Sequence, residues 1–263
     1  MVGAEGTTAL RVGLSALILL GLWRPWRWHL TVRDIGTLVL YGLALGSMNL
    51  LFYLSLRTIP LGVALAIEFV GPLTVAIFTS RKAIDYVWIA LSGLGLFLLL
   101  PLGGATRVIE PVGAAYAAAA AACWALYIVF GHRAGRIHGG QAVSVGMTVA
   151  AITVLPFGIM HSGATLLTPA ILLSGLGVAI LSSALPYSLK MVALRGLPKQ
   201  AFGVLLSSEP AIGALAGLVL LDECLSLIEW AAIGCIVMAS IGVTLSQAHR
   251  SKDLQVDHRE QAD

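Results

Sequence analysis

The chain has 263 residues, of which 58% are hydrophobic and 11% charged, and its mean hydropathy is +0.92. Domains that fold in water are about 25% charged, so this composition excludes an ordinary soluble protein and indicates an integral membrane protein. The net charge of +3 gives no indication of a nucleic-acid partner.

Apolar runs of about 20 residues recur along the chain, the length that a helix needs to cross a hydrocarbon layer about 30 Å thick. Nine such runs are predicted to be transmembrane helices, and the short breaks between them leave no room for a soluble domain. Their predicted extents are 8–23, 35–56, 61–80, 86–104, 111–131, 141–160, 169–193, 198–221 and 227–246.

Positive charges determine the predicted orientation, because short cytoplasmic loops are enriched in Lys and Arg. One set of alternate loops, together with the tail, holds twelve of the sixteen Lys and Arg residues, whereas the other set holds Arg57 and Arg107. We therefore expect the tail, residues 248–263, to be cytoplasmic. Nine crossings then place the amino terminus outside, although residues 1–8 are too short and polar to be a signal peptide.

An internal repeat relates the two halves of the chain. Arg57-Thr-Ile-Pro60 is followed by Gly71-Pro72, and Arg195-Gly-Leu-Pro198 is followed at the same spacing by Glu209-Pro210. The second half has five predicted helices, and the first half matches the last four of them. We therefore expect that a preceding helix is missing from this chain, rather than that the first helix inserts unaided.

A repeat of five crossings returns its second copy inverted in the membrane, an arrangement typical of secondary carriers. The predicted fold is accordingly all-α and membrane-embedded, with inverted five-helix repeats of which nine helices remain here. The predicted boundaries are residues 1–108 for the first repeat, 109–247 for the second and 248–263 for the tail.

Two carboxylates lie in apolar segments beside prolines. Glu209 directly precedes Pro210, and Glu68 lies four residues before Pro72. A proline inside a helix frees the carbonyl four residues earlier, and an ionisable group in hydrocarbon costs roughly 3 kcal/mol or more, so such groups are usually kept for a pathway or a site. We interpret both as proton or cation sites. The alternative is a protonated Glu that only bonds a freed carbonyl.

Two cations also fall inside apolar segments. Lys190 lies four residues after the helix-breaking Pro186 and is expected either to pair with Glu209 or to bind a substrate carboxylate. Extension of its long stem to the interface explains its position equally well. Arg11 is open to the same alternatives, and for this residue the interfacial interpretation is favoured.

A polar stripe is formed by Asn49 and Tyr53, one helical turn apart, with Tyr187 at the corresponding place in the repeat. Substrate lining and interhelical hydrogen bonding are both consistent with it. Trp124 and Tyr127 are interpreted as core packing. The GxxxG spacing of Gly42-Leu-Ala-Leu-Gly46 predicts close approach of two helices.

Several chemistries have no sequence support. The three cysteines show no CxxC spacing and the six histidines form no ligand pair, so neither a disulfide framework nor a metal site is predicted. No phosphate-binding GxxxxGK[ST] loop is present, which excludes transport driven by ATP hydrolysis on this chain. HExxH and GxSxG motifs are absent as well, and we expect a protein that is not an enzyme and needs no cofactor.

Four short motifs occur at characteristic spacings: Ala66-Ile-Glu-Phe-Val-Gly-Pro72, Asp85-Tyr-Val-Trp88, Leu185-Pro-Tyr-Ser-Leu189 and Ser208-Glu-Pro210. Together they resemble the drug/metabolite transporter superfamily, EamA type, over about residues 2–247. The resemblance implies ten helices in two inverted repeats, a bacterial cytoplasmic membrane location, and export of small amino acids such as threonine and homoserine in exchange for protons. The chain departs from that pattern by lacking the first helix.

The implied mechanism is alternating access around a cavity between the repeats. The ammonium group of the substrate is expected to meet Glu209 or Glu68, and its carboxylate the backbone freed by the prolines or a cation such as Lys190. Ser208 is included in the candidate site because it directly precedes Glu209. The expected partners are a small-molecule substrate, protons and the bilayer, and the sequence leaves a homodimer open.

Other functions remain open at this point. A broad exporter of drugs or purine-like metabolites would share the scaffold, and sequence does not fix the direction of transport. A truncated fragment that does not transport is another alternative. A membrane scaffold that does not transport would have no use for two carboxylates beside broken helices.

Replacing Glu209 by Gln keeps the size of the side chain but removes its titratable group. In the full-length protein we expect Glu209→Gln to abolish pH-dependent export, because proton exchange would lose its carrier. Amino-acid efflux from cells at two external pH values tests this. Undiminished export would remove Glu209 from the mechanism.

Overall fold

The structure is a computed structural model that describes residues 3–27, 31–59, 61–80, 82–99, 110–206, 212, 227–228, 230–239, 241–242 and 246. Within these residues the secondary structure is helical. Five helices are long and apolar enough to cross a membrane: Glu5–Arg27, Asp34–Ser55, Pro111–Ile137, Gly139–Ser162 and Pro169–Gly196. The chain divides into two compact units, each of which takes segments from both halves of the sequence. The proposed repeat boundaries therefore remain a sequence prediction.

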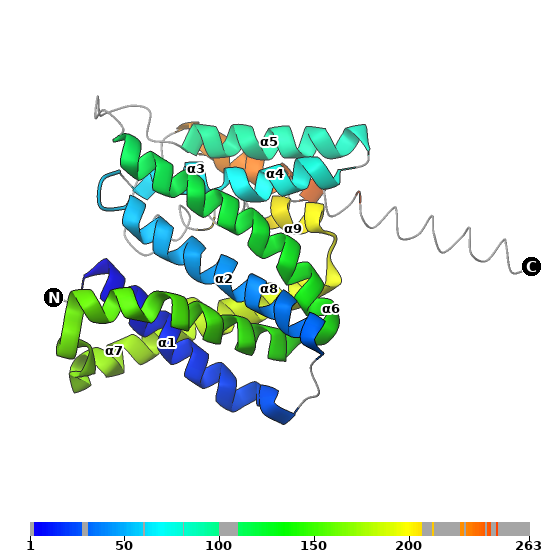
Figure 1. The fold of residues 1–263 in the computed structure, drawn as a ribbon. Helices are drawn as coiled ribbons and strands as arrows, with labels where there is room; N and C mark the ends of the chain where they lie inside the picture. The colour runs from blue at the N-terminus through cyan, green and yellow to red at the C-terminus, as the bar shows by residue number, and fades with distance from the viewer. Residues whose placement is uncertain are drawn as a thin grey trace, which may run out of the picture. The chain divides into compact units, whose positions relative to one another are not determined.

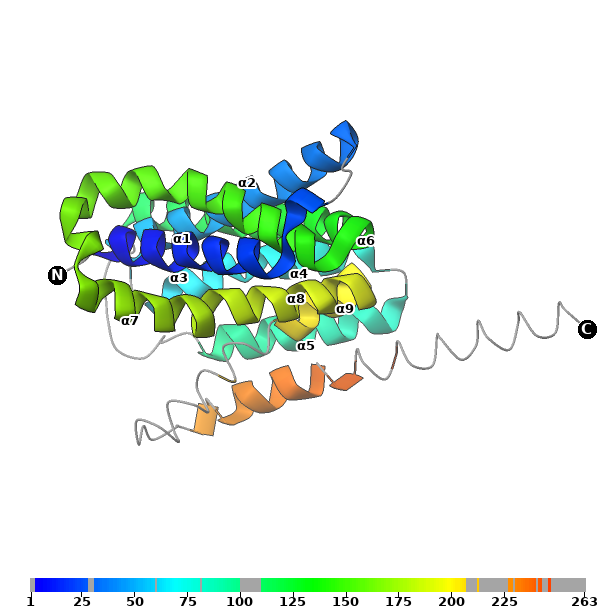
Figure 2. The ribbon, with the colours of Figure 1, turned by 90° about the horizontal axis from the view of Figure 1, so that it is seen from below.

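The first unit comprises Met1–Gly71 and Arg107–Leu197. Its α-helices are α1 (Ala4–Trp23), α2 (Val32–Ser55), α3 (Leu61–Glu68), α6 (Pro111–Ser162), α7 (Pro169–Ala179) and α8 (Leu185–Gly196). Two 3-10 turns, η1 (Pro25–Arg27) and η2 (Gly163–Leu167), and a π-helical turn, η3 (Ile180–Ala184), complete it. Figures 1 and 2 show α1 lying between the second arm of α6 and the continuous rod of α7, η3 and α8.

Helix α6 folds back on itself. A loop was predicted between segments 111–131 and 141–160, but helical structure continues through this region, so that expectation is wrong. The ring of Tyr41 lies against both Gly131 and Gly146. These glycines would be about 22 Å apart in a straight helix, since each residue rises 1.5 Å. Helix α6 is therefore a hairpin of two arms, as Figure 1 shows.

Glycines allow α2 to approach the second arm of α6. A Cβ atom on Gly42 would lie 2.5 Å from Cβ of Val149, and one on Gly46 would lie 2.9 Å from Cα of Ala150. Contacts this short are not available to any residue with a side chain unless the helices move apart. The close approach predicted from the GxxxG spacing is confirmed.

Local signals fix the ends of α2 and α1. At the start of α2, the Thr31 hydroxyl accepts a hydrogen bond from the Asp34 amide at 3.2 Å, and the Asp34 carboxylate accepts one from the Thr31 amide at 3.1 Å. This capping box satisfies two amides that have no partner within the helix. Helix α1 ends where Arg24 adopts a left-handed conformation with φ of 45° and its amide bonds to the Leu20 carbonyl.

The second unit comprises Pro72–Thr106 and Pro198–Asp263. It contains most of α4 (Val70–Thr79), together with α5 (Ala83–Leu99), α9 (Lys199–Leu206) and the apolar helix Trp230–Ala239. Small and branched side chains from all four segments form its core: Ala76, Ile89, Ala201 and Ala239.

The predicted segment 198–221 is described as helix up to Leu206. The interpretations of Ser208, Glu209 and Pro210, and of the tail at 248–263, lie outside the described residues. The count of nine membrane helices likewise remains a prediction.

We expect Gly42→Ala to lower the stability of the protein by about 1–3 kcal/mol, the usual cost of overpacking. The matched control is Gly36→Ala on the same helix, where a Cβ atom meets nothing within 4 Å. Alanine favours helix over glycine, so the control should be neutral or slightly stabilising. Thermal unfolding of the purified protein in detergent measures both. Equal effects at the two positions would contradict the close packing of α2 on α6.

Candidate functional site

A π-helical turn interrupts the long helix between α7 and α8. Helix α7 ends at Ala179, η3 covers Ile180–Ala184, and α8 begins at Leu185. Pro186 explains the interruption, because its ring has no N–H group and clashes with the carbonyl four residues earlier. The wider turn lets the Leu185 amide bond to the Ile180 carbonyl, five residues back. The helix-breaking role predicted for Pro186 fits this geometry, and such π-turns are frequent at functional sites.

Helix α1 supplies side chains to this turn. The hydroxyl of Ser15 donates to the carbonyl of Ala179 at 2.9 Å, and the carbonyl of Arg11 lies 2.6 Å from the same hydroxyl as a second acceptor. The guanidinium of Arg11 donates through Nη1 to the hydroxyl of Ser182 at 3.2 Å. Two residues one turn apart on α1 therefore hold the interrupted part of the neighbouring helix.

Arg11 also contacts α2. Its Nη2 donates to Oδ1 of Asn49 at 2.5 Å, and its guanidinium carbon lies 5.6 Å from the ring centroid of Tyr53. Side chains on neighbouring helices therefore hold this guanidinium between them. The interpretation of Arg11 as an interfacial residue stays a prediction, but its guanidinium has partners on two neighbouring helices that the sequence did not indicate.

Asn49 joins the two helices that flank α1. Its amide nitrogen donates to the Leu45 carbonyl at 2.9 Å and to the Tyr187 hydroxyl at 3.2 Å, while its oxygen accepts from Arg11. Interhelical hydrogen bonding, one of the two explanations for the polar stripe, is thus present. Asn49 and Tyr187, which occupy equivalent places in the predicted repeat, are in direct contact. We use the term polar cluster for Arg11, Asn49, Tyr53, Ser182 and Tyr187.

Aromatic rings extend the polar cluster toward α6. The ring of Tyr187 packs edge-on against Tyr127, with centroids 6.3 Å apart, and Tyr127 stacks on Tyr41 at 5.3 Å. The ammonium of Lys190 lies 5.5 Å from the Tyr187 ring centroid and 6.0 Å from that of Trp124. Tyr127 and Trp124 are buried, so their interpretation as core residues is confirmed. Lys190 is held by aromatic faces, which stabilise a cation that has left water.

The helix that carries Glu68 is interrupted as well. Helix α3 ends at Glu68, whose side chain is 5% exposed, and α4 begins at Val70. Pro72 is the third residue of α4, a position where a missing N–H group costs no hydrogen bond within the helix. The helix break predicted here is therefore present, whereas the role of Glu68 in proton or cation binding stays a prediction.

Contacts with α6 fix this second break. A Cβ atom on Gly71 would lie 2.1 Å from the carbonyl oxygen of Ala121, so no residue with a side chain fits there. The ring of Phe69 packs against the ring of Trp124, with centroids 4.9 Å apart. The ammonium of Lys190 approaches the same Trp124 ring. The residues after Glu68 and the aromatic surroundings of Lys190 thus share one supporting side chain.

An ionic group that the sequence analysis missed lies at the start of α1. Glu5, which is buried, forms an ion pair with Arg57, and Nη2 of Arg57 lies 3.2 Å from Nε2 of His161. Arg57 and His161 are 104 positions apart, so no local spacing could have indicated the contact. Arg57 belongs to the loops predicted to face outward, which would place this group at the outer surface.

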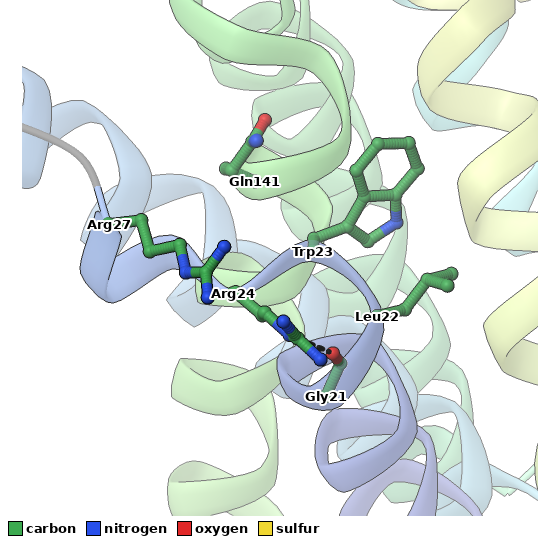
Figure 3. Close-up of a pocket in the computed structure, with 6 residues that line it drawn as sticks. All are labelled: Gly21, Leu22, Trp23, Arg24, Arg27 and Gln141. Atoms are coloured by element: carbon green, nitrogen blue, oxygen red, sulfur yellow. Dashed lines mark hydrogen bonds between the residues drawn. The ribbon is translucent and has the colours of Figure 1, made fainter.

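Among the described residues, two pockets adjoin α1. The smaller, of about 140 Å³, lies between α1 and α7 and is lined by Thr7, Leu10, Arg11, Ile171, Ser174, Gly175 and Val178. The larger, of about 530 Å³, lies at the other end of α1 and is drawn in Figure 3, where the Arg24 side chain turns back to the Gly21 carbonyl at 3.4 Å. Its described lining includes two basic side chains, Arg24 and Arg27, and none that is acidic. No cluster of metal-ligating side chains occurs in the described part of the chain.

Known proteins resemble this chain in sequence and in fold. The model of the EamA-like transporter family matches residues 111–245. The threonine/homoserine exporter RhtA of Escherichia coli (strain K12) is 47% identical over 257 residues, covering 98% of this chain and 87% of that protein. RhtA of Salmonella typhimurium (strain LT2) is 48% identical with the same coverage. A solved crystal structure superposes with a TM-score of 0.69 over 93% of this chain and 88% of its own, at 19% identity, which indicates a shared fold.

The hydrogen bond from Ser15 to the π-turn has a testable energetic consequence. Ser15→Ala leaves the Ala179 carbonyl without this donor and should destabilise the protein by about 0.5–1.5 kcal/mol. The matched control is Ser174→Ala, because that hydroxyl bonds to carbonyls of its own helix and is exposed. Thermal unfolding in detergent compares the two. A loss no greater than that of the control would show that Ser15 does not support the turn.

Proposed function

Because this chain belongs to the EamA-like transporter family, we propose that it exports small amino acids of the threonine and homoserine kind across the bacterial cytoplasmic membrane. It is a multi-pass membrane protein and a transporter, not an enzyme. The observation that carries the proposal is the near-complete match to two proteins named as threonine/homoserine exporters. The tail, beyond the described residues, is proposed to lie in the cytoplasm.

Alternating access between inverted repeats, coupled to inward movement of protons, is the mechanism we propose. The two helix interruptions support it, because broken helices offer polar backbone in the middle of a membrane and carriers place their sites there. In this scheme the substrate ammonium meets Glu68 or Glu209. Protonation of that glutamate from outside then favours release of the amine.

The pocket beside Arg11 is small enough to suit a small solute. Sites for drug-sized ligands usually enclose about 300–1,000 Å³. The pocket between α1 and α7 measures about 140 Å³ and offers both hydroxyl and aliphatic side chains, among them Thr7 and Leu10.

Efflux from cells tests the function and the role of Glu68 together. Cells that express the chain should export threonine and homoserine faster than cells without it, and the rate should rise with an inward proton gradient. Glu68→Gln should lower efflux about tenfold or more and remove its dependence on the gradient, because a charge-assisted contact of about 1.5–3 kcal/mol is lost.

The matched control is Glu110→Gln, since Glu110 is exposed before α6 and its side chain caps no amide. It should leave efflux unchanged. If the Glu68 variant kept its response to the proton gradient, Glu68 would not be the coupling group. Cells that exported neither amino acid would contradict the proposed function itself.

A further inference from the structure

The guanidinium of Arg11 is surrounded by neutral partners. Its contacts are with Asn49, Ser182 and Tyr53. In the part of the chain that the structure describes, no carboxylate pairs with it. Arginine stays protonated in proteins, so a full positive charge is held here by dipoles alone. A charge inside an apolar span is costly, and sites of this kind are usually retained for a ligand or a pathway.

The position of Arg11 along α1 also places its charge inside the apolar span. Arg11 lies seven residues after Ala4, the first residue of α1. At 1.5 Å per residue, this is about 10 Å from the start of α1. Two hydrogen bonds direct the terminal nitrogens toward Asn49 and Ser182, on the helices packed beside α1. The packing therefore positions the charge among other helices.

The hydrogen bonds of Arg11 leave donors of its guanidinium without a partner among the described residues. A guanidinium has five N–H donors, and those to Asn49 and Ser182 use two of them. Nε of Arg11 is buried and has no acceptor among the described residues. Nε and a terminal nitrogen together form the fork that binds both oxygens of a carboxylate. Such a bidentate contact would supply both the missing acceptor and the missing counter-charge.

A space for a small solute adjoins this side chain. The pocket of about 140 Å³ that Arg11 lines has the hydroxyls of Thr7 and Ser174 and the aliphatic side chains of Leu10 and Ile171 in its wall. Hydroxyl and methyl groups in one small pocket match the side chain of a hydroxy amino acid. Arg11 lies on α1, and the pocket that it lines is formed between α1 and α7.

We propose that Arg11 binds the carboxylate of the transported solute, through Nε and a terminal nitrogen, next to the π-turn. The inference deepens the proposed function in that the solute is taken to be an amino acid. Aromatic rings approach both cations, those of Trp124 and Tyr187 for Lys190 and that of Tyr53 for Arg11. Arg11 has in addition a buried Nε without an acceptor among the described residues, and in this proposal it is the cation that selects for a carboxylate.

Ligands that differ in the carboxylate test this directly. The purified full-length protein is titrated calorimetrically with L-threonine, with L-threoninamide, which lacks the carboxylate, and with 3-hydroxybutyrate, which lacks the ammonium. The unaltered protein should prefer threonine over threoninamide about 10- to 100-fold, as expected for one bidentate charged contact. Arg11→Gln should reduce this preference to near unity. Arg136→Gln, which removes an exposed arginine on α6, should retain it.

A second variant separates binding from folding. Asn49→Asp places a permanent carboxylate at the position whose oxygen lies 2.5 Å from Nη2 of Arg11. The internal ion pair should preserve thermal stability while removing the preference for threonine over threoninamide. An Asn49→Asp protein that is stable and keeps the full preference would overturn the proposal, even if Arg11→Gln failed to fold.

The outcomes distinguish this inference from the proposed function. If the unaltered protein binds 3-hydroxybutyrate in an Arg11-dependent way but no amino acid, the carboxylate site stands and the amino-acid function fails. If it binds threonine and Arg11→Gln keeps the same preference over threoninamide, the function stands and the site is overturned. Binding of no carboxylate at all overturns both.

Discussion

In hydrocarbon, a backbone amide or carbonyl can be satisfied only by another part of the protein. The described helices meet most of this requirement internally, and at η3 a neighbouring helix adds a partner. At η3 the partner comes from α1, because Ser15 donates to the Ala179 carbonyl. The candidate site follows from this requirement, since polar side chains gather where the backbone needs them.

Two cations, Arg11 and Lys190, lie near the π-turn. Arg11 and Lys190 approach Tyr187 from different helices, one through Asn49 and the other across the face of the ring. Two cations that share a neutral neighbour repel each other, and this repulsion decreases when an anion joins either of them. In the proposed mechanism Arg11 meets the acidic end of a zwitterion, and the carboxylate of Glu68 meets its amino end.

Much of the architecture could be predicted because it depends on local properties. Apolar length indicated the membrane segments, the spacing of Gly42 and Gly46 indicated a close helix contact, and Pro72 and Pro186 indicated the interruptions. The sequence could not show that the interruption before Pro186 would be a π-turn, because this depends on the donors that α1 brings to it.

Partner choice was the least predictable feature. Arg11 was assigned to the interface from its position, whereas its contacts come from residues 38 and 171 positions away. The bend in α6 was not predicted either, because it depends on contacts with a distant residue, Tyr41. The bend has a mechanical consequence. The ring of Tyr41 fills the inside of the bend between Gly131 and Gly146, so the two arms cannot close or slide independently while it remains there. A motion that changed the angle between the arms would first have to displace this ring.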